Sequence, residues 1–222
     1  MKPTATLVGY GNYAKTVVVP NLRHHVMVQR IHEIDPLQIP PDDWSVTWDT
    51  APLPRSDDES DLILVAGFHY THAPIAVQAL ARGRYAVVEK PVTTDACQAG
   101  ELVAAVRREQ KFFACFHKHY LPFNDYARDD LRIDVGDPLS YHCILYEVPL
   151  PALHWYRWPN SRSRIGSNSC HWLDHFLFLN EFTKAVEDQL QRRNLKMLAL
   201  ERAGAFSWQE CARETYSALT DW

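Results

Sequence analysis

The chain has 222 residues, a formal net charge of −4 and a hydrophobic fraction of 46%. This length can bury a substantial core, in one large domain or two small ones. The acidic balance and the scattered basic residues argue against a nucleic-acid partner, and no apolar run approaches the roughly 20 residues that span a bilayer. We therefore expect a cytoplasmic protein with no membrane partner, whose five widely spaced cysteines stay reduced.

The first 35 residues predict a dinucleotide-binding unit. An apolar run at residues 5–8 leads into a glycine turn at residues 9–14, and a second apolar run covers residues 26–34. This order predicts strand, tight turn, helix and strand, with the N–H groups at the helix start facing a pyrophosphate. The candidate cofactor-binding residues of the turn are Gly9, Tyr10, Gly11, Asn12, Tyr13 and Ala14.

Asp35 follows the second apolar run, about 20 residues beyond the glycines. A carboxylate in this place can accept hydrogen bonds from the adenosine ribose hydroxyls and repels a 2′-phosphate. The sequence therefore favours NAD(H) as the cofactor without excluding NADP(H). A glycine turn in a different α/β fold remains the alternative interpretation.

The next segments predict the rest of a doubly wound α/β domain that ends near residue 117. Continuous apolar runs are typical of parallel strands buried on both faces, and capping residues and glycines indicate where the helices begin and end. We expect strands at residues 44–48, 62–66, 85–88 and 111–116, one helix from Pro74 to Gly83, and another that follows Asp95.

Residues 118–222 have a different composition and predict a second domain of reduced α+β type. The stretch from Leu139 to Val148 is expected to form a long strand, and residues 149–160 form an aromatic and proline-rich loop that can line a pocket. Residues 170–179 predict a helix, and residues 181–222 predict a helical tail in two pieces.

The tripeptide Glu89-Lys90-Pro91 directly follows a predicted buried strand, at the sheet edge where α/β folds bind ligands. A lysine there can donate a proton or act as an electrostatic clamp. Together with the glycine turn and the segment Phe68-His69-Tyr70-Thr71-His72, this tripeptide resembles the glucose-fructose oxidoreductase, inositol dehydrogenase and MocA (Gfo/Idh/MocA) family. The resemblance covers the whole first domain.

The resemblance implies a Rossmann domain at residues 1–117, followed at residues 118–222 by an α/β domain whose open sheet covers the active site and often forms oligomer contacts. It also implies hydride transfer between a nicotinamide and a hydroxyl-bearing carbon of a sugar, cyclitol or related small molecule. His72, Glu89 and Lys90 become further candidate cofactor contacts, although His72 can equally be a structural helix-cap residue.

The family places an aspartate four residues before a catalytic histidine, at the start of a helix in the second domain. His171 matches that histidine, but Ser167 stands where the aspartate is expected. Lys90 and His171 are therefore the candidate catalytic pair: a neutral imidazole accepts the hydroxyl proton while Lys90 stabilises the developing negative charge.

The candidate substrate contacts are Lys90, His119, Trp155 and Asp174. A metal site on His171, Asp174 and His175 is an alternative, but these residues complete no ligand shell, so we expect no metal.

Relative to the family, the second domain is short, either because the chain is a compact variant or because segments are missing. A lone strand at residues 139–148 would need to be covered, which predicts a homo-oligomer. Two function classes stay open: an NAD-dependent oxidoreductase, and a nucleotide-binding protein without turnover.

Overall fold

The computed structural model describes residues 2–40, 45–54, 58–132, 140–147 and 149–179. These residues divide into two compact units. The first unit contains the described residues up to Leu121 together with residues 142–175, and the second contains residues 122–132, 140–141 and 176–179. None of the described helices combines the length and the apolar character needed to cross a membrane.

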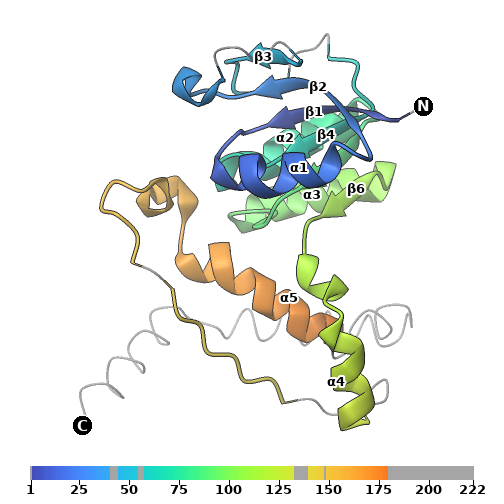
Figure 1. Ribbon diagram of the computed structural model, residues 1–222, viewed down its shortest axis with the longest axis vertical. Helices are drawn as coiled ribbons and strands as arrows, with labels where there is room; N and C mark the ends of the chain where they lie inside the picture. The colour runs from blue at the N-terminus through green and yellow to red at the C-terminus, as the bar shows by residue number, and fades with distance from the viewer. Residues whose placement is uncertain (1, 41–44, 55–57, 133–139, 148, 180–222) are drawn as a thin grey trace. The chain divides into compact units, whose positions relative to one another are not determined.

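The first unit is built on a six-stranded parallel sheet with the strand order β3-β2-β1-β4-β5-β6 (Figure 1). The order reverses between β1 and β4, which is the arrangement of a Rossmann fold and opens a crevice at the carboxyl ends of these two strands. The predicted doubly wound sheet is confirmed. The strands are β1 Thr4–Val8, β2 Met27–His32, β3 Thr47–Asp49, β4 Leu62–Val65, β5 Tyr85–Val88 and β6 Phe112–Ala114.

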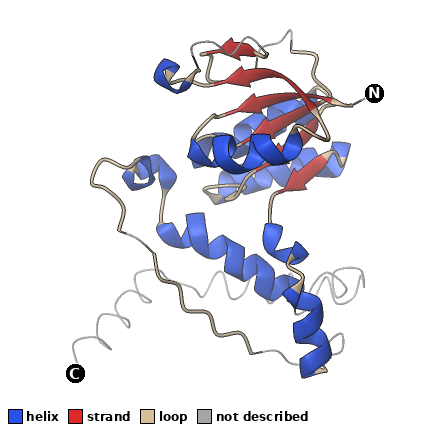
Figure 2. Cartoon of the chain, viewed as in Figure 1, coloured by secondary structure: helices blue, strands red, loops and turns tan. Residues whose placement is uncertain are grey.

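Helices cover both faces of the sheet, as Figures 1 and 2 show. Residues alternate along β1, so that Ala5 and Leu7 pack with Ala14 on one face, while Val8 joins the core beneath α2 and α3 on the other. The helices of this unit are the π-helix η1 Ala14–Val18, the α-helices α1 Val19–Leu22, α2 His72–Ala81 and α3 Ala96–Glu109, and short turns at η2 Pro36–Gln38, η3 His69–Thr71, η4 His117–Tyr120, η5 Trp155–Arg157, η6 Pro159–Ser161 and η7 Ile165–Ser169.

The predicted end of α2 and the predicted start of α3 agree with the structure, whereas α2 begins at His72, two residues before Pro74. Gly83 adopts a φ of +68° just beyond α2, and the Asp95 carboxylate accepts a hydrogen bond of 3.0 Å from the Gln98 amide N–H at the start of α3. The return bond of this cap differs from a standard capping box, because the Gln98 side chain accepts from the N–H of Thr94 rather than from that of Asp95.

The strand predicted from Leu139 to Val148 is wrong for its described part. Residues 140–147 form no regular element, and every strand in the described part of the chain belongs to the first sheet. A strand needs a neighbour for its N–H and C=O groups, and apolar alternation alone supplies none. This result also removes the argument that led to a homo-oligomer.

After the sheet, the described chain is helical rather than α+β. α4 covers Phe123–Leu131 and α5 covers Cys170–Leu179, which confirms the helix predicted at residues 170–179. η7 leads directly into α5, so the helical path begins earlier than the sequence indicated. The predicted helical tail at residues 181–222 lies outside the described residues.

A buried polar network links β1 to the loop that precedes β4. The Thr6 hydroxyl donates to Asp58 at 2.5 Å, and the Ser60 N–H donates to the same carboxylate at 3.0 Å. Burial by itself would raise the pKa of Asp58, but the hydrogen bonds from Thr6 and Ser60 hold that pKa below its usual value. The network therefore fixes the loop that precedes β4 against the central strand.

We predict that Thr6→Val lowers the free energy of unfolding by about 1–3 kcal/mol, because a buried carboxylate oxygen loses its hydroxyl donor. The matched control is Thr47→Val, the same change at an exposed position on β3, which should stay within about 0.5 kcal/mol of the parent protein. Urea unfolding monitored by circular dichroism measures both. Equal effects at the two positions would contradict the role of the network.

Candidate active site

The glycine turn follows the carboxyl end of β1 and packs against Gly67, just beyond the carboxyl end of β4. Gly9 has a φ of +92°, and a Cβ at this position would lie 2.4 Å from the Cα of Gly67. The Gly9 N–H donates to the carbonyl of His32 at 2.8 Å, which also ties the turn to β2. A Cβ on Gly11 would meet nothing within 4 Å, so the space above this residue is open for a ligand. Both glycines therefore occupy the places that a dinucleotide-binding turn requires.

The acidic side chain that faces this turn belongs to Glu33. Its carboxylate accepts the N–H of Tyr10 at 2.7 Å and that of Asp35 at 2.9 Å. The Asp35 carboxylate instead caps η2, where it accepts the N–H of Leu37 at 3.1 Å. Distance from the glycines fits both residues equally well. The overlooked signal was Asp35-Pro36, which is a typical helix N-cap followed by proline at the first helical position.

A cavity of about 430 Å³ opens at the carboxyl ends of the strands, next to the glycine turn. It brings together most of the predicted site residues, namely Gly11, Asn12, Tyr13, Ala14, His72, Glu89, Lys90, Trp155 and His171. The residues of the cavity wall that the sequence did not single out are Ala66, Gly67, His69, His117, Leu150, His154, Tyr156 and Arg164. The predicted residues outside the wall are Gly9, Tyr10, Asp35, His119 and Asp174.

The candidate catalytic pair lies in this cavity. The Lys90 ammonium donates to the carbonyl of Ser167 at 3.5 Å, at the start of the helical path that carries His171. Burial, reinforced by the positive charge of Lys90, lowers the pKa of His171 to about 4, so its imidazole is neutral at neutral pH. Among the described residues, no group hydrogen-bonds to its Nδ1 atom. This nitrogen is also buried, so the ring presents a hydrogen-bonding group that the described protein leaves unpaired.

Ser167 is buried, and its hydroxyl lies 3.5 Å from the carbonyl of Arg164. A serine hydroxyl carries no charge, so this position cannot supply the electrostatic support of a carboxylate. Lys90 and His171 therefore have no carboxylate beside them at position 167.

His72 connects two segments of the cavity wall. Its ring is almost fully buried, with Nδ1 at 2.9 Å from the carbonyl of Pro91 and Nε2 at 3.1 Å from the carbonyl of Gly67. Burial lowers the pKa of this histidine, so the neutral ring donates to one carbonyl at a time. These contacts support a structural role, which holds the Lys90-Pro91 segment, joined by a cis peptide bond, next to the end of β4.

Glu89 is the acidic residue of the cavity wall. Burial raises its pKa, and it accepts hydrogen bonds from the Lys90 N–H at 3.2 Å and from the thiol of Cys115. Burial and the adjacent Glu89 raise the pKa of Cys115 to about 12, so this thiol stays protonated. The hydrogen bonds from the Lys90 N–H and the Cys115 thiol hold the Glu89 carboxylate against the protein.

The other candidate substrate contacts separate into two groups. His119 and Asp174 form an ion pair with Nε2 and Oδ2 2.6 Å apart, outside the residues that line the cavity. Trp155 lines the cavity, and its ring packs on Phe68 and His69 with centroids 5.1 Å and 4.6 Å apart. The aromatic loop thus forms one wall, as its composition predicted.

His69 lies in the cavity wall, although the sequence did not identify it as a site residue. It is 3% exposed, beneath Trp155 and Tyr156, and none of the described residues hydrogen-bonds to its Nδ1 atom. The signal that could have identified it is its spacing, three residues before His72 and just after a buried strand, where side chains point into the crevice.

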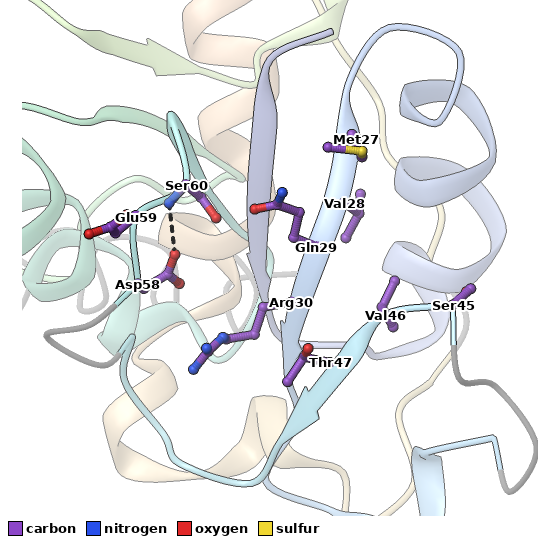
Figure 3. A pocket seen from close by; sticks show the side chains of 10 residues that line it. All are labelled: Met27, Val28, Gln29, Arg30, Ser45, Val46, Thr47, Asp58, Glu59 and Ser60. Atoms are coloured by element: carbon purple, nitrogen blue, oxygen red, sulfur yellow. Dashed lines mark hydrogen bonds between the residues drawn. The ribbon is translucent and has the colours of Figure 1, made fainter.

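A larger hollow of about 540 Å³ lies elsewhere, along the first residues of β2 and β3 and beside residues 58–60 (Figure 3). It is at the amino ends of the strands, whereas open α/β sheets bind ligands at the carboxyl ends. The described residues contain no group of three or more His, Cys, Asp or Glu side chains that could hold a metal ion. The cavity beside the glycine turn is therefore the candidate active site.

Fold and cavity together define an α/β protein with a dinucleotide-binding turn, and Lys90 and His171 lie in the wall of the adjoining cavity. Residues 5–117, more than half of the chain, match the family profile described as "Oxidoreductase family, NAD-binding Rossmann fold" (GFO_IDH_MocA). The chain belongs to this Gfo/Idh/MocA family of oxidoreductases. No curated protein sequence shows significant similarity to it.

Solved structures share the fold. A Klebsiella pneumoniae protein assigned as an oxidoreductase is 28% identical, with a TM-score of 0.51 over 59% of this chain and 39% of its own. The scyllo-inositol dehydrogenase of Lactobacillus casei, bound to NAD(H) and scyllo-inositol, is 17% identical, with a TM-score of 0.51 over 60% of this chain and 41% of its own. A 3-ketoreductase from Actinomadura kijaniata, in complex with TDP-benzene and NADP, is 23% identical, with a TM-score of 0.51 over 60% and 42%. The chain thus spans about two fifths of the length of these structures.

We predict that alanine at Gly9 affects stability, whereas alanine at Gly11 affects NADH binding. Gly9→Ala should lower the free energy of unfolding by roughly 3 kcal/mol or more, because its Cβ collides with the backbone of Gly67 and its φ is unfavourable. Gly11→Ala should leave the free energy of unfolding within about 0.5 kcal/mol of the parent but weaken NADH binding about tenfold or more, because the methyl group occupies the approach to the pyrophosphate. Urea unfolding and calorimetry separate the two effects. Unchanged NADH affinity in Gly11→Ala would place the cofactor elsewhere.

Proposed function

We propose that the protein is an NAD(P)-dependent oxidoreductase that transfers a hydride between a nicotinamide and a hydroxyl-bearing carbon of a sugar, cyclitol or related small molecule. The observation that carries this proposal is the cavity itself, whose wall holds the glycine turn together with Lys90 and His171. Membership of the oxidoreductase family supports it, as do related structures that bind NAD(H) with scyllo-inositol or NADP with a nucleotide analogue.

The residues present fit a nicotinamide dinucleotide, because the open space above Gly11 adjoins N–H groups at a helix start. When bound, the dinucleotide accepts or returns the hydride. His171 accepts the hydroxyl proton through its neutral imidazole, while Lys90 orients the oxygen and stabilises its negative charge. The alcohol carbon loses one hydride and the oxygen one proton, which leaves a carbonyl.

The low pKa of His171 sets its protonation state. A group with a pKa of about 4 is a weak base that is neutral at neutral pH. During oxidation His171 accepts the hydroxyl proton and passes it on to solvent, and during reduction it must first take a proton from solvent. Lys90 supports both directions by stabilising negative charge on the oxygen.

A second function is favoured by one observation, the serine at position 167. Without the carboxylate of the family motif, the protein could bind the dinucleotide as a sensor and perform no turnover. Both functions predict that NADH binds. Only the oxidoreductase predicts turnover, and that turnover should depend on Lys90.

We predict that NADH binds more tightly than NADPH, because two carboxylates, Glu33 and Asp35, follow β2 and repel a 2′-phosphate. Glu33→Gln should reduce this preference by about tenfold, a change of about 1.4 kcal/mol, since Glu33 faces the turn. Asp35→Asn is the matched control and should change it less, since its carboxylate caps η2. Calorimetry with both nucleotides measures the preference. A larger effect at Asp35 would return the ribose contact to that residue, and tighter NADPH binding would refute the cofactor assignment.

Lys90→Met tests catalysis, because it keeps the apolar stem of the side chain and removes the charge. We expect NADH binding to persist while turnover with polyols and sugars falls roughly 100-fold or more. Lys111→Met is the control, because Lys111 contacts the carbonyl of Gly83 and lies outside the cavity wall. Stopped-flow absorbance of NADH at 340 nm follows the reaction. Undiminished turnover in Lys90→Met would remove the lysine from the mechanism, and NADH binding without any turnover in the parent protein would favour the sensor.

A further inference from the structure

The wall of the cavity is rich in basic side chains, although the chain as a whole has a net charge of −4. Lys90 and Arg164 contribute fixed positive charges, and Glu89 is the single acidic residue among the described residues that line the cavity. Burial raises the pKa of Glu89, which weakens its capacity to balance the two cations. The remaining titratable groups of the wall are mainly histidines.

Four of these histidines, His72 among them, have a pKa that the charge of Lys90 helps to lower. Burial, and then the charges of neighbouring groups that include Lys90, lower the pKa of His69 to about 3 and that of His171 to about 4. The pKa of His117 is lowered for the same reasons, with Lys118 and Lys90 as the neighbouring cations. Arg164 contributes to the effect at His69. Lys90 therefore lies close enough to these rings to disfavour their protonation, and Lys90 and Arg164 together place two cationic groups in the cavity wall.

Arg164 is held in place at the wall. Its guanidinium lies over the ring of Tyr156, 4.8 Å from the centroid, and both Nε and Nη2 donate to Oε2 of Glu147. Glu147 does not line the cavity. Since a guanidinium has five N–H donors, the ion pair with Glu147 leaves donors for a ligand. A planar, fixed guanidinium is well suited to bind a carboxylate or phosphate.

The phosphates of a dinucleotide do not account for this charge, because they bind at the glycine turn, where the helix start receives them. An oxidised nicotinamide carries a positive charge, so a second cationic wall would oppose it unless the other ligand supplies a negative charge. Trp155 and Tyr156, which stand next to Arg164 in the wall, offer apolar ring surface for the body of a sugar.

We infer that the substrate is an anionic sugar, one that carries a carboxylate or a phosphate group, and that Arg164 is the residue that selects it. This inference rests on the proposed oxidoreductase function and narrows its substrate class. The charged group binds the guanidinium, the sugar ring lies against Trp155 and Tyr156, and the reacting hydroxyl meets Lys90 and His171. A neutral sugar offers no charged acceptor to the guanidinium donors that Glu147 leaves free, and it binds more weakly.

The experiment compares three probes at saturating NADH: a hexuronate, a hexose 6-phosphate and the parent neutral hexose, each in the gluco and galacto series. Calorimetry measures the binding of each probe. We expect at least one anionic sugar to bind roughly 10- to 100-fold more tightly than its neutral counterpart, as for a hydrogen bond to a charged group. The hexuronate and phosphate arms show which anion is preferred, and tighter binding in either arm supports the inference.

Arg164→Gln should abolish this preference, whereas Arg164→Lys should retain part of it because the charge persists without the guanidinium fork. The matched control is Arg162→Gln, at an exposed arginine that pairs with Asp95 at 3.4 Å and lies outside the cavity wall. This variant should behave as the parent protein. Parent-like NADH affinity in every variant verifies that the fold is intact.

The outcomes separate the two levels of inference. Neutral sugars that bind as tightly as anionic ones, or a preference that survives Arg164→Gln, overturn the anionic-sugar inference and leave the oxidoreductase proposal standing. Binding of NADH without binding of any anionic sugar also overturns it. Failure to bind either NADH or NADPH would instead refute the proposed function.

Discussion

The close approach of two backbone segments, at Gly9 and Gly67, is the constraint on which the site depends. These glycines follow β1 and β4, the two strands at which the sheet order reverses, and a Cβ on Gly9 would collide with the backbone of Gly67. The Ala66 N–H donates to the carbonyl of Val8 at 2.8 Å, so the strands remain paired up to the turn. Because the glycine turn leaves the sheet at this point, the helix start and the cavity wall lie side by side.

From Gly67, a series of contacts fixes the position of Lys90. The buried ring of His72 lies between the carbonyls of Gly67 and Pro91, and the Glu89 N–H donates to the carbonyl of Val65 at 2.9 Å. Lys90 lies between these anchored residues, so its backbone position is set by the strand and by the histidine together. The lysine then reaches the carbonyl of Ser167 at the start of the helical path. Preorganisation of this kind lets a charged side chain act without a costly rearrangement.

Much of the first unit could be predicted because local sequence decides it. Buried parallel strands read as apolar runs, which located β1, β4 and β5 within a residue or two, and caps located α2 and α3. The strand expected at residues 139–148 failed because pairing depends on a distant partner. Glu33 was missed for a related reason: two carboxylates at nearly the same spacing differ only in the direction each one faces, and hydrogen bonds formed after folding decide that direction.

The edge strand β3 has a consequence for the persistence of the cofactor crevice. It is three residues long, pairs only with β2, and stands beside the open hollow shown in Figure 3. Local opening of a protein begins where few contacts hold the backbone, so amide hydrogen exchange should be fastest here and slowest at β1 and β4. The Glu33 N–H donates to the carbonyl of Asp49 at the end of β3. Fraying of this edge would therefore loosen the backbone at Glu33 while the backbone contact between Gly9 and Gly67 stays closed.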